Sequence, residues 1–99
     1  MKNSALIVNT ARGPLVSEPD LVAALDAGEI GGAGLDVVPT EPLPSDSKLL
    51  GRDNVIITPH TGFYSVEALD DLQTKAARDV GLILKGDKPV YPINPEVLG

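Results

Sequence analysis

The sequence lacks cysteine and tryptophan, and its 99 residues include one histidine and one methionine. Without thiols, disulfides and thiolate metal sites cannot form, and a single histidine argues against a histidine-based structural zinc site. No segment approaches the roughly 20 consecutive apolar residues that a membrane-spanning helix needs, and no signal-peptide pattern is present. We therefore expect no bound metal, no membrane partner and a cytoplasmic location.

Positive charge is also scarce, with 8 Lys and Arg residues against 14 Asp and Glu residues and a net charge of −6. Attraction to phosphate backbones needs a cationic surface, so nucleic acid is not an expected ligand. The apolar fraction of 42% is ordinary for a globular protein, and 99 residues fit one small domain. A packed core is therefore expected, but a complete two-domain enzyme is not.

Three short apolar runs predict β-strands. Ala5 to Val8 is nearly continuous and β-branched, which is typical of a strand buried on both faces of a parallel sheet. Residues 33–38 and residues 55–58 predict a second and a third strand. Between the first two strands, Ser17 is expected to cap a short helix that Gly28 ends.

A long amphipathic helix is predicted from Ser65 to Lys85, because apolar residues recur there at intervals of three or four, with Gly86 as its end. The proline-containing residues 88–99 predict an extended tail. Strands that alternate with helices or loops predict an α/β fold, a partial Rossmann-type doubly wound parallel sheet. We treat residues 1–99 as one unit. Because three strands make only half of a doubly wound sheet, we expect this unit to be half of a larger domain.

Three polar residues follow the ends of the predicted strands, where ligands bind in sheets of this kind. Arg12 offers a planar fork that suits a substrate carboxylate. His60 is the only histidine, and Glu41 could pair with it and favour its imidazolium form for acid–base chemistry. Each has a plainer alternative: Arg12 as a surface cation, Glu41 as a solvated loop carboxylate and His60 as a structural residue.

Asp36 is a carboxylate within an otherwise apolar strand pattern. An unpaired buried carboxylate is costly, so Asp36 needs a donor. That donor could be a ligand amide or a group of the protein itself, and both interpretations stay open.

Four segments together resemble the D-isomer-specific 2-hydroxyacid dehydrogenase family. They are Leu6 to Gly13, Gly32 to Val37, Glu41-Pro42 and Asn54 to His60, in the order and approximate spacing of the family. The resemblance extends over nearly the whole chain, as far as the Asn94-Pro95-Glu96 tail. It implies the carboxy-terminal part of a Rossmann-like domain that binds NAD, with NADP also possible.

The resemblance implies a role for each candidate residue in hydride transfer between a 2-hydroxy acid and a 2-oxo acid. Arg12 would bind the substrate carboxylate, His60 would act as acid and base, and Glu41 would hold the imidazole. The residues implied to lie beside the cofactor are Asn9, Thr10, Ala11, Asp36, His60 and Gly62. The hydride chemistry itself belongs to the cofactor.

The family's glycine-rich phosphate loop, Gly-x-Gly-x-x-Gly, does not occur in these 99 residues. We therefore interpret the chain as a fragment without the glycine-rich first half and without a substrate domain, and we expect it to be inactive alone. Strand edges left unpaired in half a sheet favour homo-oligomer formation. The substrate side chain and the choice between NAD and NADP cannot be read from this sequence.

Two other interpretations remain. The segment from His60 to Ser65 is similar to the His-x-x-Trp-Tyr pattern of carboxy-terminal binding proteins, the corepressor branch of the family, although Phe63 stands in the place of Trp. This similarity would imply an NAD-responsive binding protein, but Phe63 and Tyr64 are more simply interpreted as core or interface aromatics. The third interpretation is an inert folded remnant that self-associates.

Overall fold

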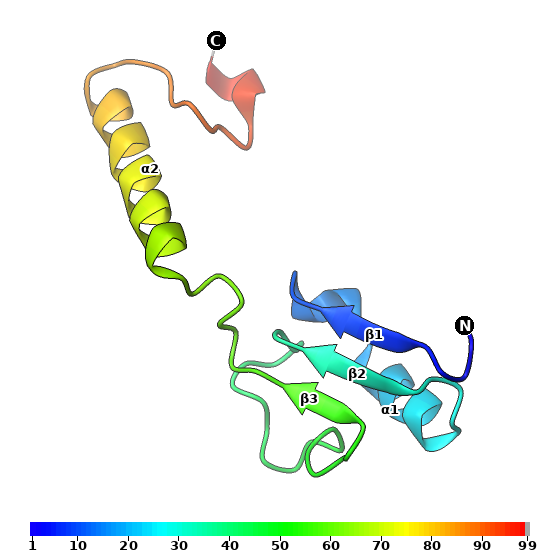
Figure 1. Ribbon diagram of the computed structural model, residues 1–99. Coiled ribbons are helices and arrows are strands. Elements are labelled where there is room, and N and C mark those ends of the chain that lie inside the picture. The colour runs from blue at the N-terminus through cyan, green and yellow to red at the C-terminus, as the bar shows by residue number, and fades with distance from the viewer. Residues whose placement is uncertain (99) are drawn as a thin grey trace. The chain divides into compact units, whose positions relative to one another are not determined.

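The computed structural model describes residues 1–98, and these residues divide into two compact units with the boundary after Gly62 (Figure 1). The first unit contains the sheet and all of the predicted site residues, and the second contains the long helix and the tail.

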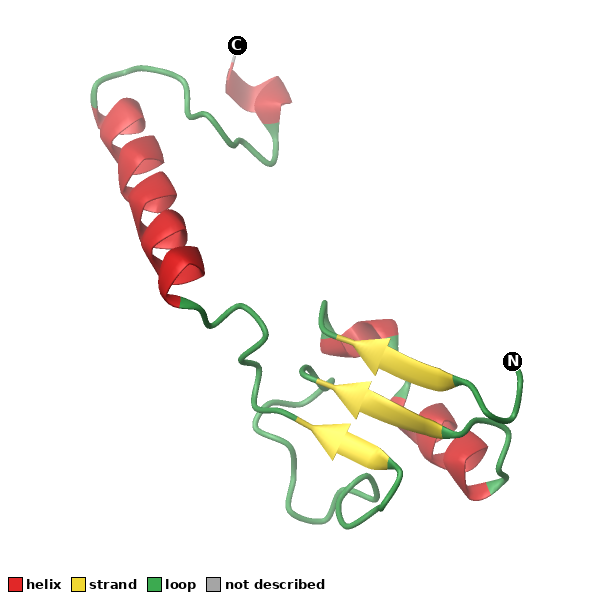
Figure 2. Cartoon of the chain, in the orientation of Figure 1, coloured by secondary structure: helices red, strands yellow, loops and turns green. Residues whose placement is uncertain are grey.

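A parallel three-stranded sheet forms the centre of the first unit (Figure 2). Its strands are β1 (Leu6–Asn9), β2 (Gly32–Leu35) and β3 (Val55–Ile57), in the order β1-β2-β3. The predicted α/β class and parallel sheet are confirmed. The second strand is shorter than expected, so Asp36 lies just past its carboxyl end rather than within it.

Helix α1 (Glu18–Asp26) connects β1 to β2 and ends before Gly28, which adopts a φ of 66° as a helix-terminating glycine often does. Ser17 occupies the N-cap position as predicted, but its side chain makes no capping hydrogen bond. A capping oxygen accepts from the second or third residue of the helix, and the second residue here is Pro19, which has no N–H group. The capping role predicted for Ser17 is therefore wrong.

The core of the first unit lies between α1 and one face of the sheet. Leu49, from the long loop before β3, is the most deeply buried large side chain at 2% exposed. Fully burying a leucine side chain contributes about 1.5–3 kcal/mol, so this loop is tied to the fold by its apolar contacts. The buried core residues are Leu21, Val22, Leu25, Ile30, Ala33, Leu35, Val38 and Leu49.

The other face of the sheet is open in the first unit. Leu6, Val8 and Ile56 point away from α1 and are 68%, 71% and 71% exposed. The expectation that β1 is buried on both faces is therefore not met within this unit. A short apolar run shows that a strand can be covered, but the number of covering layers depends on other segments.

In the second unit, helix α2 (Val66–Leu84) begins at Ser65, whose hydroxyl oxygen accepts a hydrogen bond from the Ala68 N–H at 3.1 Å. It ends before Gly86, which has a φ of 80°, so the predicted helix is confirmed. The expected extended tail is only partly present, because Pro95–Leu98 forms a short 3-10 helix, η2. Within residues 1–98, no helix has the length and apolarity that crossing a bilayer requires.

Candidate functional site

Arg12, Glu41 and His60 come from three different loops and line one hollow of about 190 Å³. Each loop follows the carboxyl end of a strand, so the parallel arrangement brings the loops to the same edge of the sheet. The other residues that line the hollow are Gly13, Pro14, Val37, Val38 and Pro39. The structure thus brings together the three residues that the sequence singles out for chemistry.

Glu41 and His60 form an ion-pair contact, with 2.7 Å between Oε2 of Glu41 and Nδ1 of His60. The predicted pairing is therefore present. The second oxygen of Glu41 accepts a hydrogen bond from the Val38 N–H at 3.1 Å. The bond with His60 is the main cause of a pKa of Glu41 below its ordinary value of 4.5, and the Val38 N–H adds to the effect. Glu41 is consequently held as a carboxylate with a defined direction.

The main chain of His60 turns sharply at the site, with a positive φ of 54° that few residues other than glycine adopt. Its N–H donates to the carbonyl oxygen of Asp36 at 2.9 Å and to that of Thr58 at 3.0 Å. These bonds anchor the turn to the end of β2, so the imidazole extends from a fixed backbone rather than from a loose loop.

Asp36 is buried at 7% exposed, and its carboxylate organises the same turn. It accepts hydrogen bonds from Thr58 Oγ1 at 2.5 Å, from the Thr61 N–H at 2.9 Å and from the Gly62 N–H at 2.8 Å. The Thr58 hydroxyl, followed by the amides of Gly62 and Thr61, lowers the pKa of Asp36 below its ordinary value of 3.8. The donor that the sequence requires for Asp36 is thus supplied by the protein.

Arg12 lies just before a 3-10 turn, η1 (Gly13–Leu15), which the sequence does not reveal. Its Nη1 donates to the carbonyl oxygen of Ala11 at 2.7 Å. Gly13 packs so closely on the next loop that an added Cβ would lie 2.0 Å from the carbonyl oxygen of Val38. The backbone of the loop that carries Arg12 therefore packs directly against the backbone of the loop that leads to Glu41.

The residues expected to lie beside a cofactor fall into two groups. Thr10 and Ala11 are exposed directly after β1, at the edge where the three strands end. The side chains of Asn9 and Asp36 are instead buried and bonded within the protein, and Gly62 contacts the Asp36 carboxylate. His60 and Gly62 are exposed as well as Thr10 and Ala11, so only Asn9 and Asp36 are withdrawn from the surface at this edge.

A second hollow, of about 280 Å³, shares Val38, Glu41 and His60 with the first. Its other lining residues are Asp36, Pro42, Leu43, Ile57, Thr58 and Pro59. The paired side chains of Glu41 and His60 can therefore be reached by small molecules from more than one cavity at this edge.

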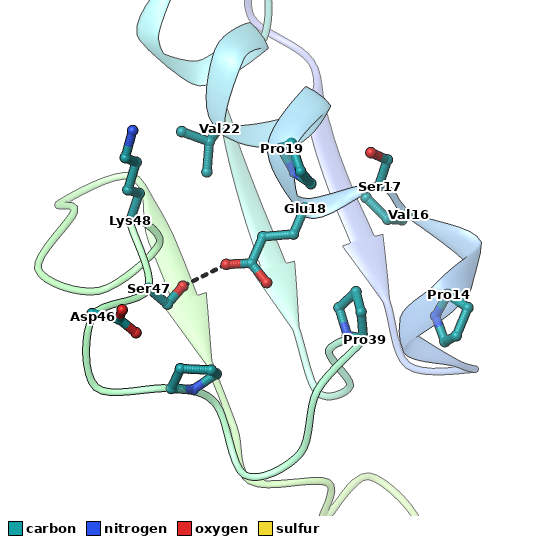
Figure 3. Close-up of a pocket in the computed structure, with 11 residues that line it drawn as sticks. Pro14, Val16, Ser17, Glu18, Pro19, Val22, Pro39, Asp46, Ser47 and Lys48 are labelled. Atoms are coloured by element: carbon teal, nitrogen blue, oxygen red, sulfur yellow. Dashed lines mark hydrogen bonds between the residues drawn. The ribbon is translucent and has the colours of Figure 1, made fainter.

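A third hollow, of about 690 Å³, is separate from Glu41 and His60 and lies between the start of α1 and the loop after β2 (Figure 3). Glu18 reaches across it and accepts a hydrogen bond of 2.6 Å from the Ser47 hydroxyl. None of the predicted site residues lines it, and its walls carry several proline rings. Within residues 1–98, no cluster of three or more potential metal-binding side chains occurs.

Comparison with known families gives a match for residues 1–62, to the family described as D-isomer specific 2-hydroxyacid dehydrogenase, NAD binding domain. Glyoxylate reductase from Thermofilum pendens is 45% identical over 98 residues, which cover 99% of this chain and 29% of that protein. Hydroxypyruvate reductase from Blautia hydrogenotrophica is 46% identical over 94 residues, which cover 95% of this chain and 29% of that protein. The chain thus spans about three-tenths of the length of these relatives.

Solved structures show the same similarity. The TT0316 protein from Thermus thermophilus has a TM-score of 0.84 and 40% identity, covering 94% of this chain and 30% of that chain. A D-isomer specific 2-hydroxyacid dehydrogenase from Xanthobacter autotrophicus, in complex with NADPH and MES, has a TM-score of 0.80 and 33% identity. The latter match covers 100% of this chain and 40% of that chain.

Proposed function

The chain belongs to the D-isomer specific 2-hydroxyacid dehydrogenase family, and from this premise we propose that its residues serve NAD(P)-dependent hydride transfer between a 2-hydroxy acid and a 2-oxo acid. The observation that carries the proposal is the single hollow lined by Arg12, Glu41 and His60. A guanidinium, a carboxylate and an imidazole are the groups that binding a carboxylate and moving a proton require.

Arg12 binds the carboxylate of the substrate in this proposal. Its guanidinium can donate two parallel hydrogen bonds, which fix the direction of the neighbouring carbonyl as well as its position. Such orientation lowers the barrier because the reacting groups are already aligned when they meet.

His60 exchanges the proton, and Glu41 positions it. With Nδ1 of His60 facing Glu41, Nε2 is the ring nitrogen that donates a proton to the carbonyl oxygen during reduction and accepts it back during oxidation. When bound, the nicotinamide supplies or accepts the hydride. Glu41 stays ionised through its bonds with His60 and the Val38 N–H, so it can stabilise the positive charge of a protonated imidazole.

The carboxyl ends of the strands are also where we propose that the nicotinamide end of the cofactor binds. The exposed chain at Thr10 and Ala11 lies where ligands bind in doubly wound sheets. We propose that these residues face the cofactor ring and that Asp36 acts chiefly by fixing the turn of His60, since three protein donors already bind its carboxylate. A contact between Asp36 and the nicotinamide carboxamide would use its remaining acceptor capacity.

Residues 1–99 are proposed to turn over little substrate by themselves, because this sequence contains no Gly-x-Gly-x-x-Gly loop to hold the cofactor phosphates. We propose a small 2-oxo acid as substrate, since the relatives above are named as glyoxylate and hydroxypyruvate reductases. The hollow of about 190 Å³ is of a suitable size for such a molecule.

A chimera tests the proposal. The matching segment of Thermofilum pendens glyoxylate reductase is replaced by residues 1–98 of this chain, and oxidation of NADH and NADPH by glyoxylate is followed by absorbance. We expect the chimera to be active and the separate chain to be inactive. Replacing Arg12 by Gln should raise the KM for glyoxylate about 10- to 100-fold, the value of a hydrogen-bonded charge pair. A folded chimera whose KM is unchanged by this replacement would contradict the role of Arg12.

We further propose that the chain self-associates, because the exposed Leu6, Val8 and Ile56 place apolar area on one sheet face. Sedimentation of the purified chain should show a dimer or larger species, and replacing Val8 by Lys should shift it toward monomer. A wild-type monomer at high concentration would oppose this part of the proposal. No structural feature among the described residues favours the corepressor interpretation of Phe63 and Tyr64, and the relatives reported above are named for enzymatic activities.

A further inference from the structure

We propose that Asn9 is a positioning residue for Arg12, so that the side-chain amide of Asn9 sets how the site receives a substrate carboxylate. This inference rests on the proposed function, because it assumes that Arg12 is the carboxylate-binding group. It also changes the role expected for Asn9, from a residue beside the cofactor to a residue that holds the substrate-binding Arg12 in position.

The amide of Asn9 bonds to the main chain on both sides of the peptide that leads into Arg12. Its Nδ2 donates to the carbonyl oxygen of Arg12 at 2.8 Å, and its Oδ1 accepts from the Ala11 N–H at 3.1 Å. The Arg12 carbonyl also accepts from the N–H of Leu15, the last residue of η1, at 3.2 Å. The backbone of Arg12 is thus held at its own carbonyl and at the preceding residue.

The guanidinium of Arg12 is linked to the same peptide. Its Nη1 donates to the carbonyl oxygen of Ala11, whose N–H is the group that Asn9 holds. A shift of the Ala11 peptide would therefore move the guanidinium as well as the main chain. Asn9 acts on Arg12 through two routes that share one short segment.

Asn9 is well suited to act as a fixed support. It is 6% exposed, and its own carbonyl oxygen accepts the Asp36 N–H at 2.9 Å, which joins the ends of β1 and β2. The only buried polar side chains among residues 1–98 are those of Asn9 and Asp36, and each organises one loop of the site. Asn9 supports the loop of Arg12, and Asp36 supports the turn of His60.

The chemistry of the position favours an amide. One end must donate to a carbonyl oxygen and the other must accept from an N–H, and a short side chain that does both at once is asparagine. Aspartate has nearly the same shape but would place an oxygen against the carbonyl of Arg12. Asn9→Asp therefore removes one bond and introduces repulsion without changing the volume.

The test compares the wild-type chain with Asn9→Asp and with Asn3→Asp, the same chemical change at an exposed position. Nitrogen-15 NMR follows the Ala11 amide and the Nε–H of Arg12, and the signals of Ala33 and Ile57 report whether the sheet is intact. We expect Asn9→Asp to shift both reporter signals and to speed hydrogen exchange at Ala11, with Asn3→Asp matching the wild type. Unchanged reporter signals in a folded Asn9→Asp chain would overturn the proposal.

If Asn9→Asp fails to fold, two measurements still decide the question. Asn9→Ser is smaller and adds no charge, and it should produce the same changes at Arg12. In the wild-type chain, the Ala11 amide and the Nδ2 protons of Asn9 should exchange slowly with solvent. Fast exchange at both would show that the two bonds do not form, and the proposal would be wrong.

Kinetics in the chimera separate positioning from a general loss of structure. Asn9→Asp should raise the KM for glyoxylate about 10- to 100-fold, as expected for a misplaced binding group. In a background of Arg12→Gln, Asn9→Asp should add less than about twofold, because coupled residues are not additive. Independent effects of the two replacements on the KM for glyoxylate would contradict action through Arg12.

The failure of this inference is distinguishable from that of the proposed function. If Arg12→Gln leaves the KM for glyoxylate unchanged, the carboxylate-binding role of Arg12 fails. The NMR comparison needs no substrate and still shows whether Asn9 holds Arg12. If Arg12→Gln raises KM and Asn9→Asp does not alter KM or the Arg12 signals, only the inference about Asn9 fails.

Discussion

Nδ1 of His60 lies 2.7 Å from Oε2 of Glu41, although the two residues are 19 positions apart in different loops. The other oxygen of Glu41 is held by the Val38 N–H, and the turn of His60 is held by the carbonyl of Asp36. Both partners of the pair are therefore fixed by main-chain bonds at the ends of strands. This arrangement directs Nδ1 of His60 at Glu41, and the proposed proton exchange is assigned to Nε2.

The contact between Glu41 and His60 predicts an effect on stability in acid. The pKa of Glu41 is lowered from its ordinary value of 4.5 in the folded chain, so its contribution to stability is fully present above pH 4.5. That contribution is lost as the pH falls from 4.5 through the lower, folded value. Chemical unfolding between pH 6 and about 3 should show Glu41→Gln losing less stability over this range than the wild type.

Glu29→Gln, at an exposed carboxylate after α1, is the matched control for that series. Its stability should fall with acid in parallel with the wild type. A slope for Glu41→Gln that is indistinguishable from that of Glu29→Gln would mean that the pair with His60 does not stabilise the fold.

Gly13 predicts a steric effect. A Cβ at this position would lie 2.0 Å from the Val38 carbonyl oxygen, and backbone atoms cannot move aside cheaply. Gly13→Ala should destabilise the chain by about 1–3 kcal/mol, as overpacking does. Gly81→Ala is the control, because nothing lies within 4 Å of its Cβ and alanine favours a helix by up to about 1 kcal/mol. Thermal unfolding of both variants with equal midpoints would contradict this packing.

The two serines at helix starts predict unequal effects. Ser65 accepts the Ala68 N–H, whereas the side chain of Ser17 makes no capping bond. Ser65→Ala should cost about 1 kcal/mol and speed exchange of the Ala68 amide. Ser17→Ala should change the free energy of unfolding by much less. Hydrogen exchange in each helix measures the loss of stability. A larger loss of stability for Ser17→Ala than for Ser65→Ala would refute the assignment of the caps.

Much of the fold is predictable from sequence because it depends on local patterns. Apolar runs correctly predicted the three strands. The spacing of apolar residues correctly predicted α2, with Ser65 before it and Gly86 after it. The open sheet face was not predictable from Leu6 and Val8, because an apolar run does not show whether other segments cover one or both faces of its strand. The 3-10 helix η2 in the tail was also missed, since short turns depend weakly on composition.

The meeting of Arg12, Glu41 and His60 at one edge was predictable, but the hydrogen bonds that hold their loops were not. Arg12, Glu41 and His60 could be named because polar residues after parallel strands meet at one edge. The bonds of Asn9 and Asp36 could not be foreseen in the same way. The donors to Asp36 lie 22 to 26 positions away, and Asn9 acts through a turn whose geometry the residue types alone do not specify.

The acid–base role of His60 is the central claim, and the turnover number of a single variant of the chimera tests it most directly. Asn replaces His60, because Asn tolerates the positive φ of 54° at this position but cannot exchange a proton near neutral pH. With glyoxylate and NADH saturating, we predict that kcat falls about 10²- to 10⁴-fold while the chimera stays folded. A kcat within about twofold of the unsubstituted chimera would contradict the account, since the loss of a general acid costs far more.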